Sequence, residues 1–440
     1  MKPPGMSFVL PEQLIKRYER EGSPGLKTNF QMIYPDMDAK PRSNLSHRKR
    51  KIGLFLASQP HHGGTFQHNL AMLEAVAALH RETYEAVIAY QHRDFLPYLN
   101  DLEIASLYIP PAFFDRAASK LMRLSRLPVT WQRAVTPYFL GVAKEIIRQQ
   151  CDLWIFASQE SLAYEIPVPA LMVIHDLMHR YQRGFPEVSA HGEYGRRERH
   201  YQAVCRWARG IMVESELGKQ QVLDCYGPNP DQVFVLPTVT CQYILDGQEQ
   251  AELRSLYGLP DKYFFYPAQF WEHKNHKRLI QAAALLRDSF PDIQLVFVGS
   301  QKNAYASVRA LVDQLGLAAN VHFLGYVPES HMAGLYRRAR ALIMPTFFGP
   351  TNIPPREAIA LGCPVAVSDI DGMRDQMGDA AIFFDPTSVP EIALAMEQLW
   401  RDDALCEDLA RRGLARAAQW TQRHFNARLQ DIVDAISLPS

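Results

Sequence analysis

The sequence predicts an α/β protein with two parallel β-sheets, each covered by helices on both faces. Short apolar runs of strand length alternate with stretches of helical periodicity, an order typical of parallel strands joined by helices. The alternation occurs over residues 51–245 and begins again over residues 255–420, with a polar stretch near residue 250 between them. A length of 440 residues also suits two or three domains rather than one.

The first half opens with a polar lead-in, residues 1–50, which ends in a basic run and is expected to lie outside the main core. An apolar burst at residues 51–57 predicts a buried strand, followed by a glycine turn and a helical pattern through Leu70, Leu73 and Ala77. Further apolar runs predict strands at residues 84–89, 153–156, 170–174 and 210–213.

The second half repeats this pattern. Apolar runs predict strands at residues 262–266, 294–298, 321–324, 341–344 and 363–367. Helical patterns lie between them at residues 277–287, 304–315, 330–338 and 356–361. A last helix within residues 421–440 is expected to pack back on the first domain. Because open sheets of this kind bind ligands at the carboxyl ends of their strands, a cleft between the two domains is the expected site.

Composition excludes several classes of protein. The 47 Lys and Arg residues balance the 47 Asp and Glu residues, so no overall field attracts nucleic acid. The six cysteines form no C-x-x-C pair, which argues against a zinc site or a disulfide scaffold. No apolar run approaches the roughly 18 residues of a membrane span, and the amino terminus lacks the order of a signal peptide. We therefore expect a cytoplasmic protein.

The loop that precedes the predicted helix at residues 356–361 is a candidate phosphate site. Its Thr351 and Asn352 can cap a helix, and two prolines follow at positions that tolerate a missing N–H group. The amides of Thr351, Asn352 and Ile353 would then face a diphosphate, with Glu357 in the first helical turn. The alternative is structural, because a proline-rich turn and a first-turn glutamate are stable without a ligand.

Three other strand ends carry residues of interest. Lys274 can neutralise a phosphate, although loop lysines are usually solvated. Gly63 and Gly64 permit close backbone approach after the first strand, but they lack the G-x-G-x-x-G spacing of a dinucleotide site. His175 ends a strand and is either a structural histidine or a substrate contact.

A metal site is not expected. The pairs Asp36 with Asp38 and Asp369 with Asp371 each supply two carboxylates, and an oxygen-ligated cation needs more ligands than that.

Taken together, these segments resemble the retaining, nucleotide-sugar-dependent glycosyltransferases of the GT-B fold, in the group 1 (family 4-like) type that builds bacterial polysaccharide and O-antigen. The resemblance covers about residues 51–430 and is most specific from Val321 to Asp369. Val213–Glu216 also looks like a serine-containing step of that family. The resemblance implies two Rossmann-like domains that face a central cleft, with the acceptor on residues 51–245 and the nucleotide sugar on residues 255–420.

The resemblance also implies roles for individual residues. Gly63 and Gly64 match the flexible loop over the donor diphosphate, and His175 matches the residue that contacts the transferred sugar. Lys274 matches the lysine that holds phosphate. Glu357 matches the second glutamate of an E-x7-E pair, which usually holds the ribose hydroxyls. The strand end that meets the base corresponds to Tyr326 and Val327.

Two positions depart from the family pattern. The first glutamate of the pair is replaced by Gly349, and the arginine normally found five residues before the lysine is Gln269. We interpret both as a changed grip on the donor, in which Thr351, Asn352 or Gln269 supplies neutral hydrogen bonds instead.

The mechanism implied by the resemblance retains the anomeric configuration. The departing diphosphate oxygen takes the acceptor proton on the same face, so the site needs charge stabilisation and positioning rather than a base. Lys274 and the amides of Asn352 and Ile353 would stabilise the leaving group, so neither a cofactor nor a metal is expected.

Two basic stretches are candidates for contact with the acceptor. Residues 113–150 contain seven Lys and Arg residues among apolar ones, which suits a peripheral membrane contact or a solvated helix face. The second stretch is an arginine and tyrosine cluster within residues 180–209, which would bind a pyrophosphate-lipid acceptor or form ion pairs with Glu187, Glu193 and Glu198.

The leading hypothesis is a glycosyltransferase that moves a sugar, with mannose as the candidate, from a GDP- or UDP-linked donor to a glycan or lipid-linked acceptor. Two alternatives stay open: a nucleotide-sugar epimerase on the same fold, and a catalytically inactive sugar-nucleotide-binding scaffold, prompted by Gly349 and Gln269.

Overall fold

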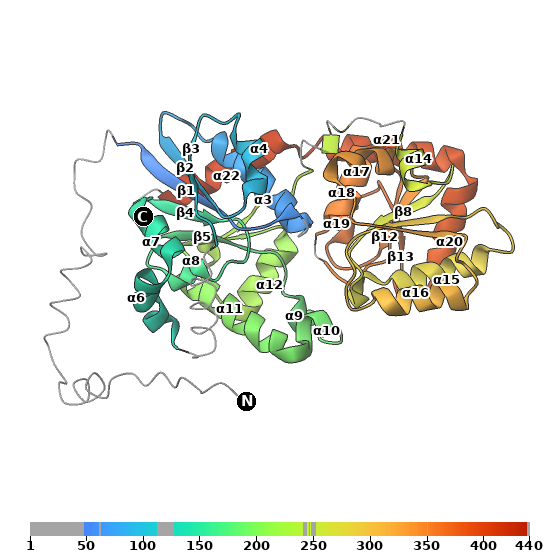
Figure 1. Cartoon of the computed structure of the whole chain (residues 1–440), viewed down its shortest axis with the longest axis horizontal. Coiled ribbons are helices and arrows are strands. Elements are labelled where there is room, and N and C mark those ends of the chain that lie inside the picture. Colours follow the sequence, from blue (N-terminus) through green and yellow to red (C-terminus); the bar gives the residue numbers. More distant parts are fainter. Residues whose placement is uncertain are drawn as a thin grey trace, which may run out of the picture. The chain divides into compact units, whose positions relative to one another are not determined.

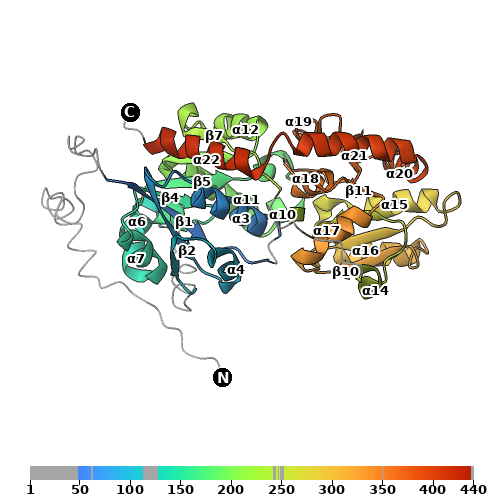
Figure 2. The same cartoon turned by 90° about the horizontal axis from the view of Figure 1, so that it is seen from above.

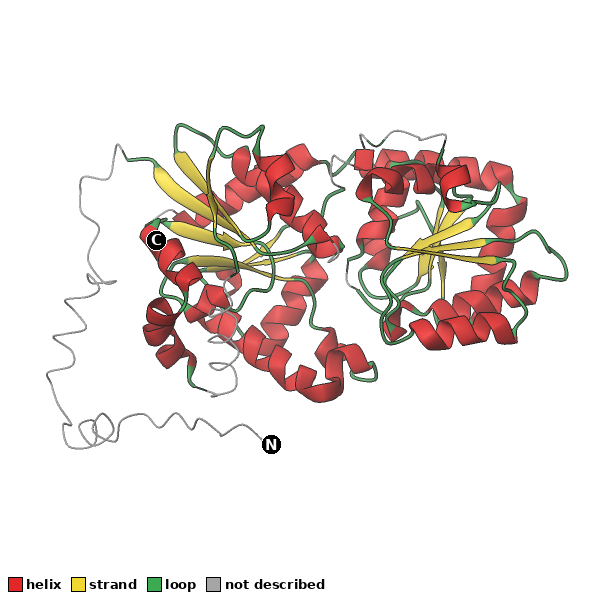
Figure 3. Ribbon diagram, in the orientation of Figure 1, coloured by secondary structure: helices red, strands yellow, loops and turns green. Residues whose placement is uncertain are grey.

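A computed structural model of the chain describes residues 48–60, 63–111, 127–240, 244–245, 247, 252–349 and 351–437. These residues form a seven-stranded and a six-stranded sheet, with helices on both faces of each (Figures 1 and 3). Every strand pair in the described parts of the chain is parallel. The predicted α/β class with two parallel sheets is therefore confirmed. Most of the lead-in, residues 1–47, lies outside the described residues.

The first sheet has the strand order β3-β2-β1-β4-β5-β6-β7. Its strands are β1 (Arg50–Leu56), β2 (Tyr84–Tyr90), β3 (Ala105–Tyr108), β4 (Leu153–Phe156), β5 (Ala170–Ile174), β6 (Gly210–Val213) and β7 (Val233–Val235). The five central strands were predicted, and the two edge strands were not. Most side chains of β3 are exposed and β7 has only three residues, so neither gives a continuous apolar run.

The helices of the first half connect these strands. They are α3 (Gly64–Ala77), α4 (Leu96–Leu99), α6 (Val129–Phe139), α7 (Gly141–Arg148), α8 (Leu162–Glu165), α9 (Met178–Tyr181), α10 (Pro186–Ser189), α11 (Glu193–Trp207) and α12 (Glu216–Tyr226). Local sequence explains the limits of α12. Ser215 caps its first turn by accepting a hydrogen bond from the Gly218 amide, and Gly227 ends it in the left-handed conformation.

The second sheet has the strand order β10-β9-β8-β11-β12-β13. Its strands are β8 (Phe264–Pro267), β9 (Leu295–Val298), β10 (Val321–Gly325), β11 (Ala341–Met344), β12 (Val365–Ser368) and β13 (Ile382–Phe384). The helices of this half are α14 (Leu253–Tyr257), α15 (His276–Leu286), α16 (Tyr305–Gln314), α17 (Glu329–Arg338), α18 (Ile353–Ala360), α19 (Met373–Met377), α20 (Val389–Arg401), α21 (Asp403–Ala417) and α22 (Gln422–Ser437).

Helix α18 begins earlier than predicted, and this changes the position of Glu357. The helix starts at Ile353, so Pro354 and Pro355 lie inside its first turn, where no intrahelical N–H bond is needed. Glu357 consequently lies in the second turn, not in the first. The expectation that a first-turn glutamate supports the helix dipole was wrong.

Helix α22 lies beside α3, as both views show (Figures 1 and 2). Phe425 and Leu429 of α22 are fully buried in the same apolar cluster as Leu70 and Leu73 of α3. Polar contacts add to this packing, because Gln430 accepts a hydrogen bond from the His80 amide at 3.0 Å. The last helix of the chain thus completes the core under the first sheet.

Gly53 in β1 is expected to tolerate no side chain. A Cβ at this position would lie 2.4 Å from ring carbons of Trp154, which is completely buried on the neighbouring strand. We predict that Gly53→Ala lowers the free energy of unfolding by about 1–3 kcal/mol, the usual cost of overpacking a core. Urea unfolding measures this. The control Gly195→Ala in α11, where a Cβ would meet only the Arg199 guanidinium at 3.5 Å, should leave the urea midpoint equal or higher, since alanine favours helix.

Candidate active site

Residues 49–440 group into one structural unit, which contains a cavity of about 640 Å³. Its lining comes from residues that follow strands of both sheets, as expected for ligand sites in parallel sheets. The cavity brings together all of the residues that were predicted for the site: Gly63, Gly64, His175, Gln269, Lys274, Tyr326, Val327, Gly349, Thr351, Asn352, Ile353 and Glu357.

The amino termini of α3 and α18 approach each other in this cavity. Gly63 precedes α3 with a φ of 59°, a conformation that favours glycine. A Cβ on Gly64 would lie 3.0 Å from the Ile353 side chain, so the glycine permits this approach. Among the described residues, the amides of Gly64 and Thr65 have no hydrogen-bond acceptor. Both helix ends therefore suit an anion.

The α18 terminus offers fewer amides than predicted. The Asn352 amide donates to Gln376 Oε1 at 2.9 Å, and Gln376 Nε2 donates back to the Asn352 carbonyl at 2.6 Å. The Asn352 side chain makes no capping bond and instead donates to the Gly349 carbonyl at 3.0 Å. Since prolines have no N–H group, the amides still available to a ligand at this terminus are those of Thr351 and Ile353. The prediction that the Asn352 amide faces a phosphate was wrong.

Lys274 ends a short 3₁₀ turn, Glu272–Lys274, after β8. The buried Tyr266 hydroxyl donates to the Lys274 carbonyl at 2.9 Å and fixes the backbone there. Lys274 lines the cavity, and its ammonium group has no ion-pair partner in the described parts of the chain. Burial lowers the pKa of Lys274 to about 8, while Asp176 and Glu187 act in the opposite direction. A partly buried, unpaired ammonium is suited to a ligand anion.

Glu187 of α10 holds the turn that carries Lys274. Its carboxylate accepts hydrogen bonds from the His273 amide at 2.9 Å, from the His273 ring, and from Asn303 at 3.1 Å. The His273 ring also stacks on Phe348, with ring centroids 3.9 Å apart. Side chains from both halves of the chain thus fix the position of the lysine.

His175 and Glu214 form an ion pair at the ends of the adjacent strands β5 and β6. His175 Nδ1 lies 2.6 Å from Glu214 Oε1. Burial lowers the pKa of His175, but its bond to Glu214 and nearby carboxylates outweigh burial and raise the pKa above its ordinary value. The second oxygen of Glu214 accepts from the Thr351 hydroxyl. This hydroxyl is therefore already paired within the protein, contrary to the expectation of a neutral bond to the donor.

Glu357 and Gln269 are also tied to neighbours. The Tyr336 hydroxyl of α17 donates to Glu357 Oε2 at 2.6 Å, and both residues line the cavity. Gln269 Oε1 accepts from Trp271 Nε1 at 2.9 Å. Val327 is buried, whereas the neighbouring Tyr326 is 57% exposed at the mouth. These contacts orient Glu357 and Gln269 before any ligand binds.

The backbone at Gly349 disfavours a side chain, and therefore the glutamate that the resembling family has at this position. Its φ is 127°, and a Cβ would lie 2.7 Å from the Asn352 side chain. We predict that Gly349→Glu, alone or with Gln269→Arg, lowers rather than raises activity, because the loop before α18 must move. Initial rates measure this. A rate above that of the wild type in either variant would show that the loop accepts a side chain at this position.

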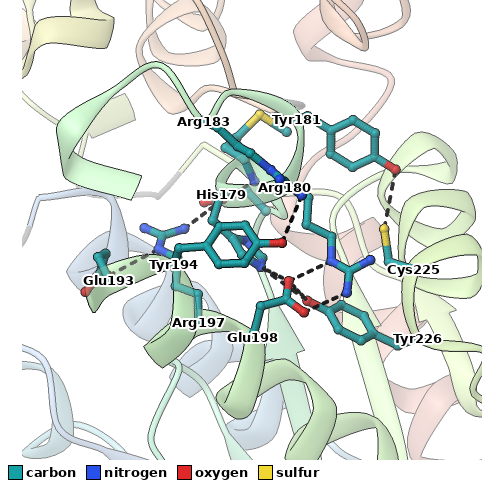
Figure 4. A network of polar contacts seen from close by, with 12 residues as sticks. His179, Arg180, Tyr181, Arg183, Glu193, Tyr194, Arg197, Glu198, Cys225 and Tyr226 are labelled. Carbon is teal, nitrogen blue, oxygen red and sulfur yellow. Dashed lines mark hydrogen bonds and ion pairs between the residues drawn. The ribbon is translucent and has the colours of Figure 1, made fainter. Parts of the chain in front are cut away.

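The arginines within residues 180–209 are largely committed to internal contacts (Figure 4). Glu198 accepts two hydrogen bonds from Arg180, at 2.6 Å each, and others from His179 and Tyr226. Arg196 pairs with Glu193, while Arg197 contacts both Glu193 and Asp176. Of the two interpretations of this cluster, ion pairing is confirmed for these residues. Glu187, however, pairs with His273 and not with an arginine.

The basic stretch at residues 113–150 is described only in part, since residues 112–126 lie outside the described residues. Within the rest, Arg133 donates to the Tyr164 carbonyl at 3.1 Å, and Arg148 pairs with Glu145. The described helices include none that is both long and apolar enough to span a membrane.

Of the two aspartate pairs considered for a metal, only Asp369 with Asp371 lies within the described residues. Asp369 accepts two hydrogen bonds from Arg374, and Asp36 and Asp38 lie outside the described residues. No group of three or more His, Cys, Asp and Glu side chains that could hold a metal ion occurs in the described ranges.

Sequence reasoning missed three titratable residues that line the cavity. His68 of α3 lies edge-on to His175, with ring centroids 5.3 Å apart, and burial and the charge of His175 lower its pKa to about 4. Glu329 of α17 accepts from Gln67 at 2.9 Å. Glu214 was noticed only as part of a strand-end motif. Its place one residue after β6 was the available signal, since neighbouring parallel strands end at one sheet edge.

The two Rossmann-like domains define the class of the protein as GT-B. The fold is similar to that of WaaG, a glycosyltransferase involved in lipopolysaccharide biosynthesis, with a TM-score of 0.63 and 17% identity over 87% of this chain and 99% of that chain. It is also similar to Anabaena HepE, solved in complex with UDP-glucose, with a TM-score of 0.65 and 15% identity over the same 87% and 99%.

Sequence comparisons narrow this class. Residues 250–416 match the family model for glycosyl transferases group 1. The chain is 31% identical over 163 residues to O-antigen chain mannosyltransferase B of Escherichia coli, covering 36% of this chain and 42% of that protein. It is also 31% identical over 126 residues to O-antigen chain mannosyltransferase RfbU of Salmonella typhimurium, covering 29% of this chain and 35% of that protein. The matches thus span less than half of each relative. Residues 250–416 are thus similar in sequence to group 1 glycosyl transferases, as the motifs indicated.

Proposed function

We propose that the protein is a retaining glycosyltransferase that moves a hexose from a nucleotide-diphosphate sugar to a glycan or lipid-linked acceptor in polysaccharide biosynthesis. One observation carries the proposal: Lys274, which has no ion-pair partner among the described residues, and the amino termini of α3 and α18 line the same cavity. Each of these features favours an anion, and a diphosphate leaving group requires several of them at once.

In this proposal the protein stabilises the diphosphate as the glycosidic bond breaks. Lys274 neutralises the charge that develops on the leaving oxygen, and the amides of Ile353 and Gly64 donate hydrogen bonds to the phosphates. The leaving oxygen accepts the acceptor's proton on the face where the new bond forms, so configuration is retained. The leaving group then needs no metal ion, because the protein supplies the positive charge.

Other cavity residues would bind the remainder of the donor. Glu357, held by Tyr336, would accept hydrogen bonds from the ribose hydroxyls. The backbone at Tyr326 and Val327 would meet the base, and His175 would contact the transferred sugar. We propose mannose as the transferred sugar because two relatives are O-antigen mannosyltransferases. A UDP-linked sugar is the alternative donor, because HepE was solved in complex with UDP-glucose.

A donor panel tests this function. Purified protein is incubated with GDP-mannose, UDP-glucose, UDP-galactose or UDP-N-acetylglucosamine, each with mannosides or polyprenyl-pyrophosphate oligosaccharides, with and without EDTA. We expect nucleotide release from one donor, unchanged by EDTA, and an α-linked product by NMR from an α-linked donor. Donors that all stay intact would contradict the function, and a β-linked product would contradict retention. Nucleotide binding without release would favour the inactive scaffold, and a new nucleotide sugar formed without acceptor would favour the epimerase.

A further inference from the structure

Glu214 connects two parts of the cavity that are far apart in the chain. It follows β6, and its Oε1 lies 2.6 Å from His175 Nδ1 at the end of β5. Its Oε2 accepts a hydrogen bond from the hydroxyl of Thr351, which precedes α18. One carboxylate therefore fixes both the imidazole and the loop in which glycine has replaced the glutamate of the family pattern.

The directions in which the pKa values of His175 and Glu214 are shifted favour a charged pair. Burial raises the pKa of Glu214, but the hydrogen bond and the charge of His175 outweigh burial, so the net shift is downward. The pKa of His175 is shifted upward, which is the matching direction for an ion pair. The other titratable groups facing this histidine are His68, Glu160 and Asp176.

This arrangement determines what His175 can offer to a ligand. Its Nε2 is buried, and it has no hydrogen-bond partner in the described parts of the chain, while the residue lines the cavity. A neutral ring with its proton on Nδ1, toward Glu214, would leave Nε2 as an acceptor. The charged ring makes Nε2 a donor. Glu214 thus sets whether the cavity presents a donor or an acceptor at this point.

We propose that Glu214 is a positioning residue for glycosyl transfer, which keeps His175 oriented with Nε2–H toward a hydroxyl oxygen of the transferred sugar and anchors Thr351 beside it. The role of Glu214 in glycosyl transfer rests on the proposed function. The effect of Glu214 on the titration of His175 is independent of that function, because it concerns the protein without a ligand. Glu214 thereby ties the sugar side of the cavity to the loop that leads into α18.

Histidine NMR on the full chain tests the effect on His175 directly. The ε1 carbons of histidine are labelled, and His175→Asn assigns the resonance. In the wild type, His175 is expected to titrate above its ordinary range. In Glu214→Gln, the titration should move to lower pH, because the opposite charge is lost. Exposed Glu216, two residues away, gives the control Glu216→Gln, which should leave the titration unchanged.

Turnover of GDP-mannose, or of the panel donor that the wild type cleaves, tests the role in transfer. At pH 7.5 the Glu214→Gln variant should have a lower kcat than the wild type, since losing the opposite charge leaves a smaller fraction of His175 protonated. Its rate should recover toward acidic pH. Thr351→Val should raise KM for the donor, and Thr351→Ser, which keeps the hydroxyl, should raise KM by less.

Each outcome decides one question. An unchanged His175 titration in Glu214→Gln would overturn the inference whatever the enzyme does. A shifted titration with no wild-type turnover of any donor would overturn the proposed function and keep the effect on His175. A shifted titration with an unchanged pH–rate profile would overturn the role of Glu214 in transfer. If Glu214→Gln does not fold, Glu214→Asp keeps the charge but moves it away from the ring, and it should lower the pH at which His175 titrates relative to the wild type. An unchanged titration in Glu214→Asp would then overturn the inference.

Discussion

Turnover of the nucleotide sugar is expected to fall about 10²–10³-fold when Lys274 is replaced by alanine, the usual cost of removing one group that stabilises a developing oxyanion. Lys274 supplies an ammonium group, unpaired among the described residues, to the cavity, and the amides of Ile353 and Gly64 contribute only partial charges. Folding should be unaffected, because the Lys274 side chain makes no ion pair in the described structure whose loss would destabilise it.

Initial rates and circular dichroism measure this prediction. The matched control is Lys277→Ala, three residues further on, where the lysine pairs with Glu272 and is 38% exposed. It should retain normal kcat. Equal kcat values in Lys274→Ala and in the control would show that Lys274 does not stabilise the leaving group.

The pH dependence of the reaction follows from the same residue. A lysine with a pKa of about 8 loses its charge as the pH rises through that value. We therefore expect kcat/KM, which reports the free enzyme, to decline above about pH 8. Lys274→Arg should be slower and should lose this decline, since an arginine stays charged. A decline at the same pH in both proteins would assign it to another group.

Glu357→Gln is expected to weaken donor binding by about 10–100-fold, because hydrogen bonds to a charged group are worth about 1.5–3 kcal/mol. The substitution keeps the shape of the side chain and an acceptor for the Tyr336 hydroxyl, which donates to Glu357 at 2.6 Å. The loss should thus arise from the ribose contact and not from unfolding.

Calorimetry with GDP and 2′-deoxy-GDP, or with the matching uridine pair, isolates this contact. The wild type should discriminate against the deoxynucleotide, and Glu357→Gln should discriminate much less, which forms a double-mutant cycle. The control Tyr336→Phe keeps the carboxylate and should lose less affinity. Equal discrimination in the wild type and in Glu357→Gln would place the ribose elsewhere.

The sequence predicts the interior of this fold better than its edges. Buried strands such as β4 and β5 are continuous apolar runs, and so their positions follow from composition. Strand β3 has mostly exposed side chains, and β7 and β13 have three residues each. Such strands form because a neighbouring strand offers backbone hydrogen bonds, and the local sequence does not indicate which segments will be paired in this way.

The sequence allowed us to predict which residues meet in the cavity, because parallel strands bring their carboxyl ends to one edge of the sheet. It did not allow us to predict which atoms of these residues stay available to a ligand. The Asn352 amide is taken by Gln376, a residue 24 positions away, and the Thr351 hydroxyl is taken by Glu214, which is 137 positions away. Pairings over such distances depend on how the loops pack and leave no periodic or local pattern in the chain.

The position of a bound nucleoside diphosphate tests the central claim most directly. A crystal structure of the protein soaked with GDP or UDP is predicted to show the terminal phosphate within hydrogen-bond distance of Lys274 Nζ and of the Ile353 amide, with ribose hydroxyls at Glu357. A nucleotide bound outside this cavity, or bound within it with Lys274 turned away from the phosphates, would contradict the assignment of the donor site.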